Sequence, residues 1–152
     1  MDRLLFCPTI ALTRDKSRTI NPTKNKPVRF TLLRTIKPLK RKIKRRLEKI
    51  NFPENRVKIV AGFIEETINY KNLPSTVSFA YVDFDFYEPI KIALNFLDTV
   101  LSKNGLVIVD DYDFFSTGVK AAVDEFILKE TGKYQLYIPE TGLGHFAVIK
   151  KL

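Results

Sequence analysis

Two runs of apolar residues, each followed at once by aspartates, constrain this chain more than any other feature. The first run is Val77–Val82, which leads into Asp83-Phe84-Asp85. The second is Leu106–Val109, which leads into Asp110-Asp111-Tyr112-Asp113. Short runs that are apolar at nearly every position are typical of strands covered on both faces of a parallel sheet. We therefore expect two strands that end at one edge of a common sheet, where ligands of open α/β sheets bind.

Helical spacing follows each of these runs. Pro89 stands where a first helical turn tolerates proline, and apolar residues behind it recur at helical spacing as far as Leu101, with Asn104-Gly105 as the predicted stop. A second helix is predicted around Val119–Phe126, ending near Gly132. Alternation of strands and helices predicts an α/β fold with right-handed crossovers between parallel strands.

Three further segments read as strands. Val57–Ala61 is a short β-branched run that ends at Gly62, and it predicts a strand leading into a loop. Tyr134–Ile138 and His145–Ile149 are separated by a few residues that include proline and glycine. This spacing predicts an antiparallel hairpin at the edge of the sheet.

The charge of the chain is divided unevenly. Residues 1–50 hold 16 Lys and Arg against 3 Asp and Glu, whereas residues 51–152 hold 10 against 14. Within the basic part, Leu39, Ile43, Leu47 and Ile50 share one stripe of a predicted helix whose other positions are mostly cationic. A solvated helix face is the favoured interpretation, and contact with nucleic acid or a membrane surface is the less favoured one. We divide the chain into an irregular basic segment, residues 1–37, and an α/β domain, residues 38–152.

The totals favour a soluble intracellular protein. At 152 residues the chain has the size of one domain, and it contains no run of eighteen apolar residues that would predict a membrane span. The single cysteine, Cys7, has no partner for an internal disulfide and no basic or histidine neighbour to activate it. The N-terminus lacks the pattern of a secretory signal. We expect a cytoplasmic location.

The aspartates at the two strand ends suggest a divalent cation. Neighbouring parallel strands lie about 4.8 Å apart, so Asp83 and Asp110 can reach one ion. Carboxylate oxygens suit Mg²⁺, Ca²⁺ or Mn²⁺ better than zinc. The alternative is that these aspartates cap the following helices, but a cap uses one carboxylate per helix and the chain supplies more.

Five stretches of the chain together resemble the macrocin O-methyltransferase family. These stretches are Arg56–Thr67, Ala80–Pro89, Asn104–Tyr112, Gly118–Phe126 and Pro139–Gly144. The resemblance covers roughly residues 40–152, and the spaced pair of acidic motifs carries most of it. It implies a Rossmann-like class I methyltransferase fold and transfer of a methyl group from S-adenosylmethionine to a sugar or other hydroxyl, with Mg²⁺ as the metal.

The resemblance also implies roles for individual residues. Asp83, Asp110 and Asp111 would be the catalytic metal ligands. Gly62, Phe63 and Ile64, together with Asp83, would lie near the cofactor. Asp85, Tyr87 and Tyr112 would lie near a small sugar-like acceptor.

The chain departs from the family pattern upstream. The family carries a first strand with a glycine-rich turn for the cofactor and a second strand that ends in an acidic residue, but no glycine precedes Gly62 here. Leu4–Leu12 and Val28–Leu33 are the segments that would have to substitute for those strands. The methyltransferase fold is therefore predicted to be incomplete in its N-terminal half. The alternative function is a truncated, catalytically silent domain with a binding or structural role, for instance in a homodimer.

His145 and a set of aromatic residues are the remaining candidates for the site. His145, the only histidine, is predicted to lie in the terminal hairpin, away from the acidic loops, as a surface or core residue rather than a general base. Aromatic residues flank the acidic motifs, and they either wall a sugar-binding cleft or belong to the ordinary core. They are Phe84, Phe86, Tyr87, Phe114 and Phe115.

Overall fold

The computed structural model describes residues 41–60, 62–70, 73–114, 117–140 and 144–152. These residues fall into two compact units, 41–59 and 60–152, which are described separately. The predicted boundary between residues 37 and 38, Cys7, and the substitute segments Leu4–Leu12 and Val28–Leu33 all lie outside the described residues.

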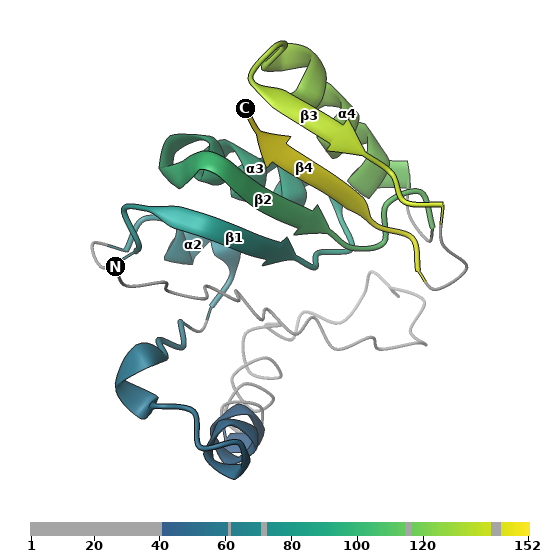
Figure 1. The fold of residues 1–152 in the computed structure, drawn as a ribbon. Coiled ribbons are helices and arrows are strands. Elements are labelled where there is room, and N and C mark those ends of the chain that lie inside the picture. Colours follow the sequence, from purple (N-terminus) through teal and green to yellow (C-terminus); the bar gives the residue numbers. More distant parts are fainter. Residues whose placement is uncertain (1–40, 61, 71–72, 115–116, 141–143) are drawn as a thin grey trace, which may run out of the picture. The chain divides into compact units, whose positions relative to one another are not determined.

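The larger unit is built on a mixed four-stranded sheet (Figure 1). Its strands are β1 (Val77–Val82), β2 (Leu101–Val109), β3 (Tyr134–Tyr137) and β4 (Ala147–Lys151), in the order β1-β2-β4-β3. β1 and β2 are parallel, whereas β4 runs antiparallel to both of its neighbours. The parallel pair and the antiparallel terminal hairpin are confirmed, and β4 lies between β2 and the edge strand β3.

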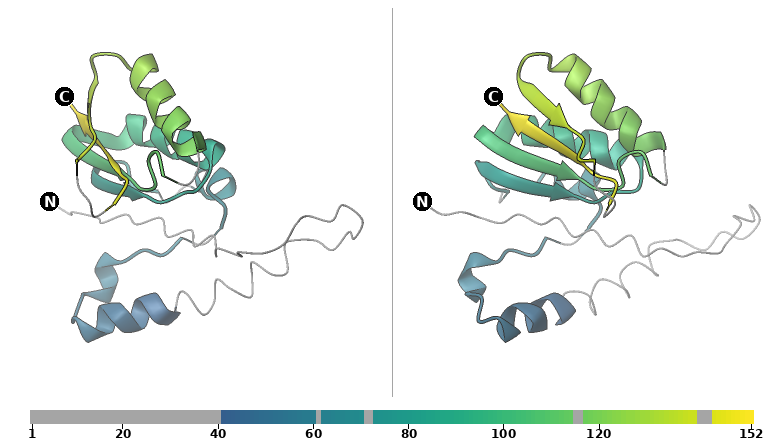
Figure 2. Two further views of the ribbon diagram at one scale, coloured as in Figure 1. Left: turned by 90° about the vertical axis from the view of Figure 1, so that its right-hand side faces the viewer. Right: turned by 45° about the vertical axis from the view of Figure 1, so that its right-hand side comes forward.

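Two long helices cover one face of this sheet (Figure 2). They are α3 (Tyr87–Val100) and α4 (Thr117–Lys129), and a short helix, α2 (Ile64–Thr67), precedes β1. Both long helices were predicted, and their apolar positions are buried against the sheet. The most completely buried side chains of the core are Val77, Val82, Ile90, Leu94, Val107, Val109, Val119, Val123 and Ile149.

The opposite face of the sheet differs from the prediction. Val107 and Val109 of β2 are buried on the helix side, as expected. Leu106, which points to the other side, is 38% exposed, and Tyr81 of β1, which pairs with Ile108, is exposed as well. The expectation that β2 is covered on both faces is therefore wrong for the described part of the chain. An apolar run shows that a strand can be buried on both faces, but whether a second layer lies there depends on the rest of the fold.

The start of β2 also differs from the prediction. Helix α3 ends at Val100 and the strand begins directly at Leu101, so Asn104-Gly105 lies within β2 and does not stop the helix. The pairing with β1 shifts register between Val77 and Phe79, which marks an irregular stretch. Asn104 adopts a left-handed conformation with φ 60°, and a Cβ on Gly105 would meet the Ser102 carbonyl oxygen at 2.7 Å. Asn-Gly therefore makes a local irregularity inside the strand.

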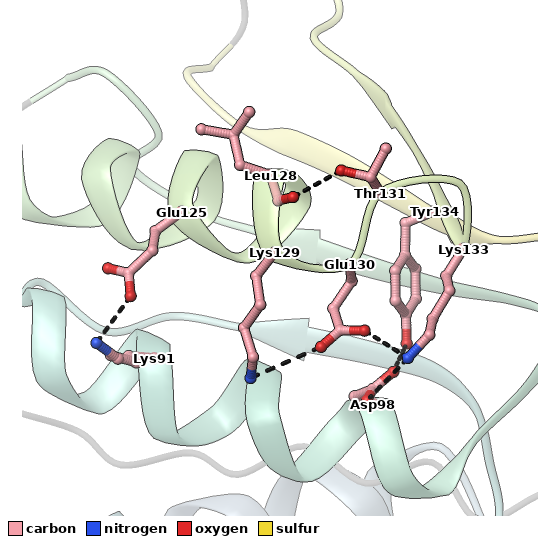
Figure 3. A network of polar contacts seen from close by, with 9 residues as sticks. All are labelled: Lys91, Asp98, Glu125, Leu128, Lys129, Glu130, Thr131, Lys133 and Tyr134. Atoms are coloured by element: carbon pink, nitrogen blue, oxygen red, sulfur yellow. Dashed lines mark hydrogen bonds and ion pairs between the residues drawn. The ribbon is translucent and has the colours of Figure 1, made fainter.

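A polar network joins the two long helices to the hairpin (Figure 3). Lys91 of α3 donates to Glu125 of α4 at 2.9 Å. At the far end of α3, Asp98 accepts a hydrogen bond from the Tyr134 phenol at 2.6 Å. These contacts link α3 to α4 and to β3.

The smaller unit consists of a helix over residues 41–49, followed by a 3-10 helix, η1 (Glu54–Arg56). The predicted helix is thus confirmed over these residues. The predicted strand Val57–Ala61 is wrong, because residues 57–60 are not in a strand and residue 61 is outside the described part. A β-branched run forms a strand only where a neighbouring strand pairs with it, and no described segment does so. None of the described helices is long and apolar enough to cross a bilayer.

Candidate active site

The two acidic strand ends are aligned by the parallel ladder. Val82 of β1 pairs with Val109 of β2, and the Asp110 backbone N–H donates to the Val82 carbonyl oxygen at 2.9 Å. This last ladder bond holds Asp110 level with Asp83, the first residue beyond β1. The expected convergence of the two motifs at one edge of the sheet is therefore observed.

Three carboxylates gather at this edge. Ligand oxygens of Asp83, Asp85 and Asp111 all lie within 4.8 Å of one another. Two of the three residues follow β1 and one follows β2, so the cluster exists only because the two strands are neighbours. Oxygen donors at this separation fit a hard divalent cation. The structure thus groups Asp83 and Asp111, as expected, with Asp85, which sequence reasoning had assigned to the acceptor.

Asp110 has a different environment from the other three. Its carboxylate accepts hydrogen bonds from the Tyr81 phenol and, at 3.0 Å, from the backbone N–H of Asp111. Burial, followed by the bond to Asp110, raises the pKa of Tyr81, so the phenol stays protonated as a donor. Asp110 therefore braces the loop that follows β2, whereas Asp111 supplies the carboxylate of that loop to the cluster.

The loop after β2 turns sharply. Asp111 and Asp113 both adopt left-handed conformations, with φ of 55° and 57°. Among residues with a side chain, aspartate and asparagine tolerate this region best. Left-handed residues other than glycine cost free energy, and such strain is often found at functional sites. The Asp110 bond to the Asp111 N–H helps to hold the first of these two turns.

The electrostatics of Asp83 favour a bound cation. Partial burial is the first cause that raises the pKa of Asp83, and the negative charges of Asp110, Asp111 and Asp85 raise it further. Repulsion among carboxylates is relieved either by protonation or by a cation placed between them. The carboxylates of Asp83, Asp85 and Asp111 are therefore chemically suited to hold a divalent metal such as Mg²⁺.

The two tyrosines expected near the acceptor have their phenols engaged with helix α4. Tyr87 donates to Glu125 and accepts from Lys91 at 2.8 Å. Tyr112 is buried, donates to Asp124 at 2.8 Å and accepts from Lys120 at 2.9 Å. Tyr87, the first residue of α3, thus joins α3 to α4, and Tyr112 ties the loop after β2 to α4.

The residues expected near the cofactor lie at the start of α2. Gly62 has φ 149°, and a Cβ there would meet the Thr67 methyl at 2.8 Å, so the chain itself requires glycine at this position. Phe63 is exposed, whereas the Ile64 side chain is part of the hydrophobic core. An exposed ring suits stacking on the flat face of a purine. Of these three residues, Phe63 alone has a side chain that is exposed to solvent.

The prediction for His145 is confirmed for its exposure and wrong for its distance from the acidic loops. It is an exposed residue, as expected, but it is not remote from the acidic loops. Its ring stacks on Phe114, with centroids 4.6 Å apart, and Phe114 belongs to the loop after β2. His145 also lines a cavity of about 320 Å³ with Tyr112, Asp113 and Glu140. Because β4 is antiparallel to β2, its start meets the end of β2, a fact that no local pattern reveals.

The aromatic residues around the acidic motifs differ in their burial. Phe84 is buried in the core, whereas Phe86 and Phe114 are exposed at the edge of the sheet. Phe115 lies outside the described residues.

The comparisons with known proteins concern the family and the fold. The family model of macrocin-O-methyltransferase (TylF) matches residues 17–136. The chain belongs to this family. The match begins well before residue 40, the start expected from the resemblance, so it includes part of the basic segment. Comparison with curated protein sequences finds no match.

Solved structures show the same fold. The O-methyltransferase NovP is 25% identical and superposes with a TM-score of 0.61, covering 70% of this chain and 42% of NovP. CalS11, a TDP-rhamnose 3'-O-methyltransferase of calicheamicin biosynthesis, is 24% identical with a TM-score of 0.53, covering 64% of this chain and 42% of CalS11. A third structure, from Clostridium thermocellum and described as an rRNA methylase, is 19% identical with a TM-score of 0.53, covering 71% of this chain and 67% of that one. The described residues thus form part of a Rossmann-like methyltransferase fold, and the chain spans less than half the length of NovP and CalS11.

Proposed function

We propose that this protein is an S-adenosylmethionine-dependent and divalent-metal-dependent O-methyltransferase that acts on a sugar or another hydroxyl compound. Membership of the macrocin-O-methyltransferase family supports the reaction class. The single observation that carries the metal dependence is the cluster of Asp83, Asp85 and Asp111 at the edge of the sheet.

In this proposal the acidic edge holds the metal and orients the acceptor. Asp83, Asp85 and Asp111 would hold Mg²⁺, which when bound supplies positive charge that lowers the pKa of an acceptor hydroxyl. Asp110 keeps the Asp111 loop in place through its bonds to Tyr81 and to the loop backbone. Tyr112 fixes the loop after β2 to α4, and Tyr87 joins α3 to α4, so that the Asp111 carboxylate would lose little freedom when a ligand binds.

The cofactor would lie near the start of α2. Phe63 is the exposed side chain there and is proposed to contact the adenine, while Gly62 lets the backbone turn into the helix. Ile64 supports this turn from within the core.

Methyl transfer by the full-length chain tests the proposal. The assay follows transfer of labelled methyl from S-adenosylmethionine to a panel of free and nucleotide-linked sugars, with Mg²⁺ or with EDTA. We expect transfer that needs Mg²⁺ and that Asp111→Asn reduces at least about 100-fold, because a lost ligand weakens metal binding. Glu130→Gln, which removes a carboxylate at the opposite end of α4, is the matched control and should keep its activity.

A calorimetric titration separates this function from its alternative. Heat on addition of S-adenosylmethionine and Mg²⁺, abolished by Asp111→Asn, supports the enzyme. A folded protein that gives no heat with either ligand at millimolar concentration, and no methyl transfer, would be a catalytically silent domain. The absence of any glycine before Gly62 is the observation that favours this second candidate.

A further inference from the structure

The helix over residues 41–49 carries a cationic surface that the proposed methyl transfer does not use. Its side chains Arg41, Lys42, Arg45, Arg46 and Lys49 are all exposed. At 3.6 residues per turn, these five positions fall within an arc of about 140° on one side of the helix. Within the described residues, none of the five forms an ion pair, and the helix makes one, between Lys44 and Glu54 at 2.7 Å.

The other side of the helix is already occupied by its own unit. Lys44, Leu47 and Glu48 line a groove of about 350 Å³ together with residues that follow the helix, among them Phe52 and Val57. The unit therefore uses the apolar side of the helix internally and leaves the cationic side open.

The positive charges on the cationic side of the helix repel one another. Arg41 and Arg45, Lys42 and Arg46, and Arg45 and Lys49 are like charges four residues apart, an arrangement that destabilises an isolated helix. Residues 41–59 hold eight Lys and Arg against two Asp and Glu, so the unit contains too few acidic groups to neutralise them. A polyanion bound along this side would remove the repulsion.

Two features favour a nucleic-acid backbone over a lipid surface. A helix that lies in a membrane interface needs a broad apolar face, but Ile43 and Leu47 are half-buried and only Ile50 is exposed among the apolar positions. Three of the five cations are arginines, whose planar groups bind phosphate through paired hydrogen bonds. The helix spans about 12 Å over these residues, which is the reach of several successive phosphates.

We propose that the side of the helix formed by Arg41, Lys42, Arg45, Arg46 and Lys49 binds the phosphodiester backbone of nucleic acid without reading its sequence. The partner is recognised by charge and phosphate spacing alone. This interaction is independent of the acidic site and of methyl transfer.

Fluorescence anisotropy of the full-length chain with a labelled 20-nucleotide poly(U) RNA tests the proposal. We expect binding whose logarithm falls linearly with the logarithm of salt concentration, with a slope of roughly −2 to −3.5 for three to five phosphate contacts on a single strand. The triple variant Arg41→Gln, Arg45→Gln, Arg46→Gln should weaken binding at least about tenfold near 0.1 M salt and reduce the slope by about 2. Glutamine keeps the helix propensity, which circular dichroism can verify.

The control removes the same charge elsewhere. Lys103→Gln, Lys129→Gln, Lys150→Gln takes three lysines from the α/β unit and should leave both affinity and slope unchanged. An equal loss in this variant would overturn the proposal in favour of a net-charge effect. Tighter, helix-dependent binding to phosphatidylserine vesicles or to poly-glutamate than to RNA would overturn it in favour of a membrane or an acidic protein. An absence of RNA binding at 50 mM salt and 10 µM protein would also refute it.

Discussion

The aspartates at the edge of the sheet and the cations of the helix over residues 41–49 are both concentrations of one charge, but they are held in different ways. Residues 60–152 hold eight Lys and Arg against 13 Asp and Glu, and several of these acids are brought together by buried strands. The cations, in contrast, are neighbours along a single helix and stand in solvent. In the cluster of aspartates, partial burial and the neighbouring negative charges raise the pKa of Asp83.

The two arrangements suit two kinds of binding, that of a small ligand and that of a polyanion. A site that orients a small ligand needs fixed geometry, which a packed sheet provides through its ladder and core. A surface that binds a polyanion needs only a sufficient density of charge, which one exposed helix provides. Four measurements on stability probe this contrast.

The largest effect is expected from removing a core side chain of the larger unit. Ile149 is fully buried at the centre of β4, so Ile149→Ala should lower the free energy of unfolding by about 2–5 kcal/mol. Leu47 is only half-buried in the smaller unit, so Leu47→Ala should change the main unfolding transition by less than about 0.5 kcal/mol. Urea unfolding followed by circular dichroism measures both. Equal losses would contradict the separation of the two units.

Divalent cations should stabilise the larger unit through the acidic cluster. A ligand at 100 times its dissociation constant adds about 2.7 kcal/mol to the stability of the folded state. We expect Mg²⁺ to raise the unfolding temperature of the wild-type chain and to have little effect on Asp83→Asn, because that variant lacks a ligand. Differential scanning calorimetry makes the comparison. A shift that survives in Asp83→Asn would place the ion elsewhere.

In metal-free buffer, the unfavourable environment of the Asp83 carboxylate should make the stability of the protein depend on pH. Its folded pKa is raised above the ordinary value of 3.8, so the folded protein holds this proton more tightly than the unfolded chain does. The contribution of Asp83 is therefore fully present below pH 3.8 and is lost as pH rises through the folded pKa. As pH rises from 3 to 7, the Asp83→Asn variant should therefore become progressively more stable relative to wild type. A difference that does not change with pH would contradict this.

The smallest effect is expected from an exposed ion pair on the smaller unit. Lys44 and Glu54 are 2.7 Å apart, with side chains 56% and 82% exposed. Exposed pairs of this kind contribute little, because solvent screens them. Lys44→Gln should leave the unfolding temperature unchanged within error, and a clear decrease would show that this pair holds the unit together.

Much of the larger unit was predictable because its signals are local. The runs at Val77–Val82 and Leu106–Val109, the helix after Pro89 and the terminal hairpin all follow from periodicity and turn residues. The predicted strand at Val57–Ala61 failed because a strand depends on a partner, which a local pattern does not supply. The prediction that Asn104-Gly105 stops a helix failed for a similar reason, since the same dipeptide also suits an irregular strand.

The sequence alone determined the family, the α/β class and the presence of acids at two strand ends, because these are properties of residue order. Only the tertiary structure decided which carboxylates meet. It directed Asp110 to Tyr81 and grouped Asp85 with Asp83 and Asp111. It also brought His145 against Phe114 across more than thirty residues of chain, because β4 returns antiparallel to the end of β2. The physical reason is that side-chain direction at a strand end depends on the turn that follows and on neighbouring strands, which are distant in sequence.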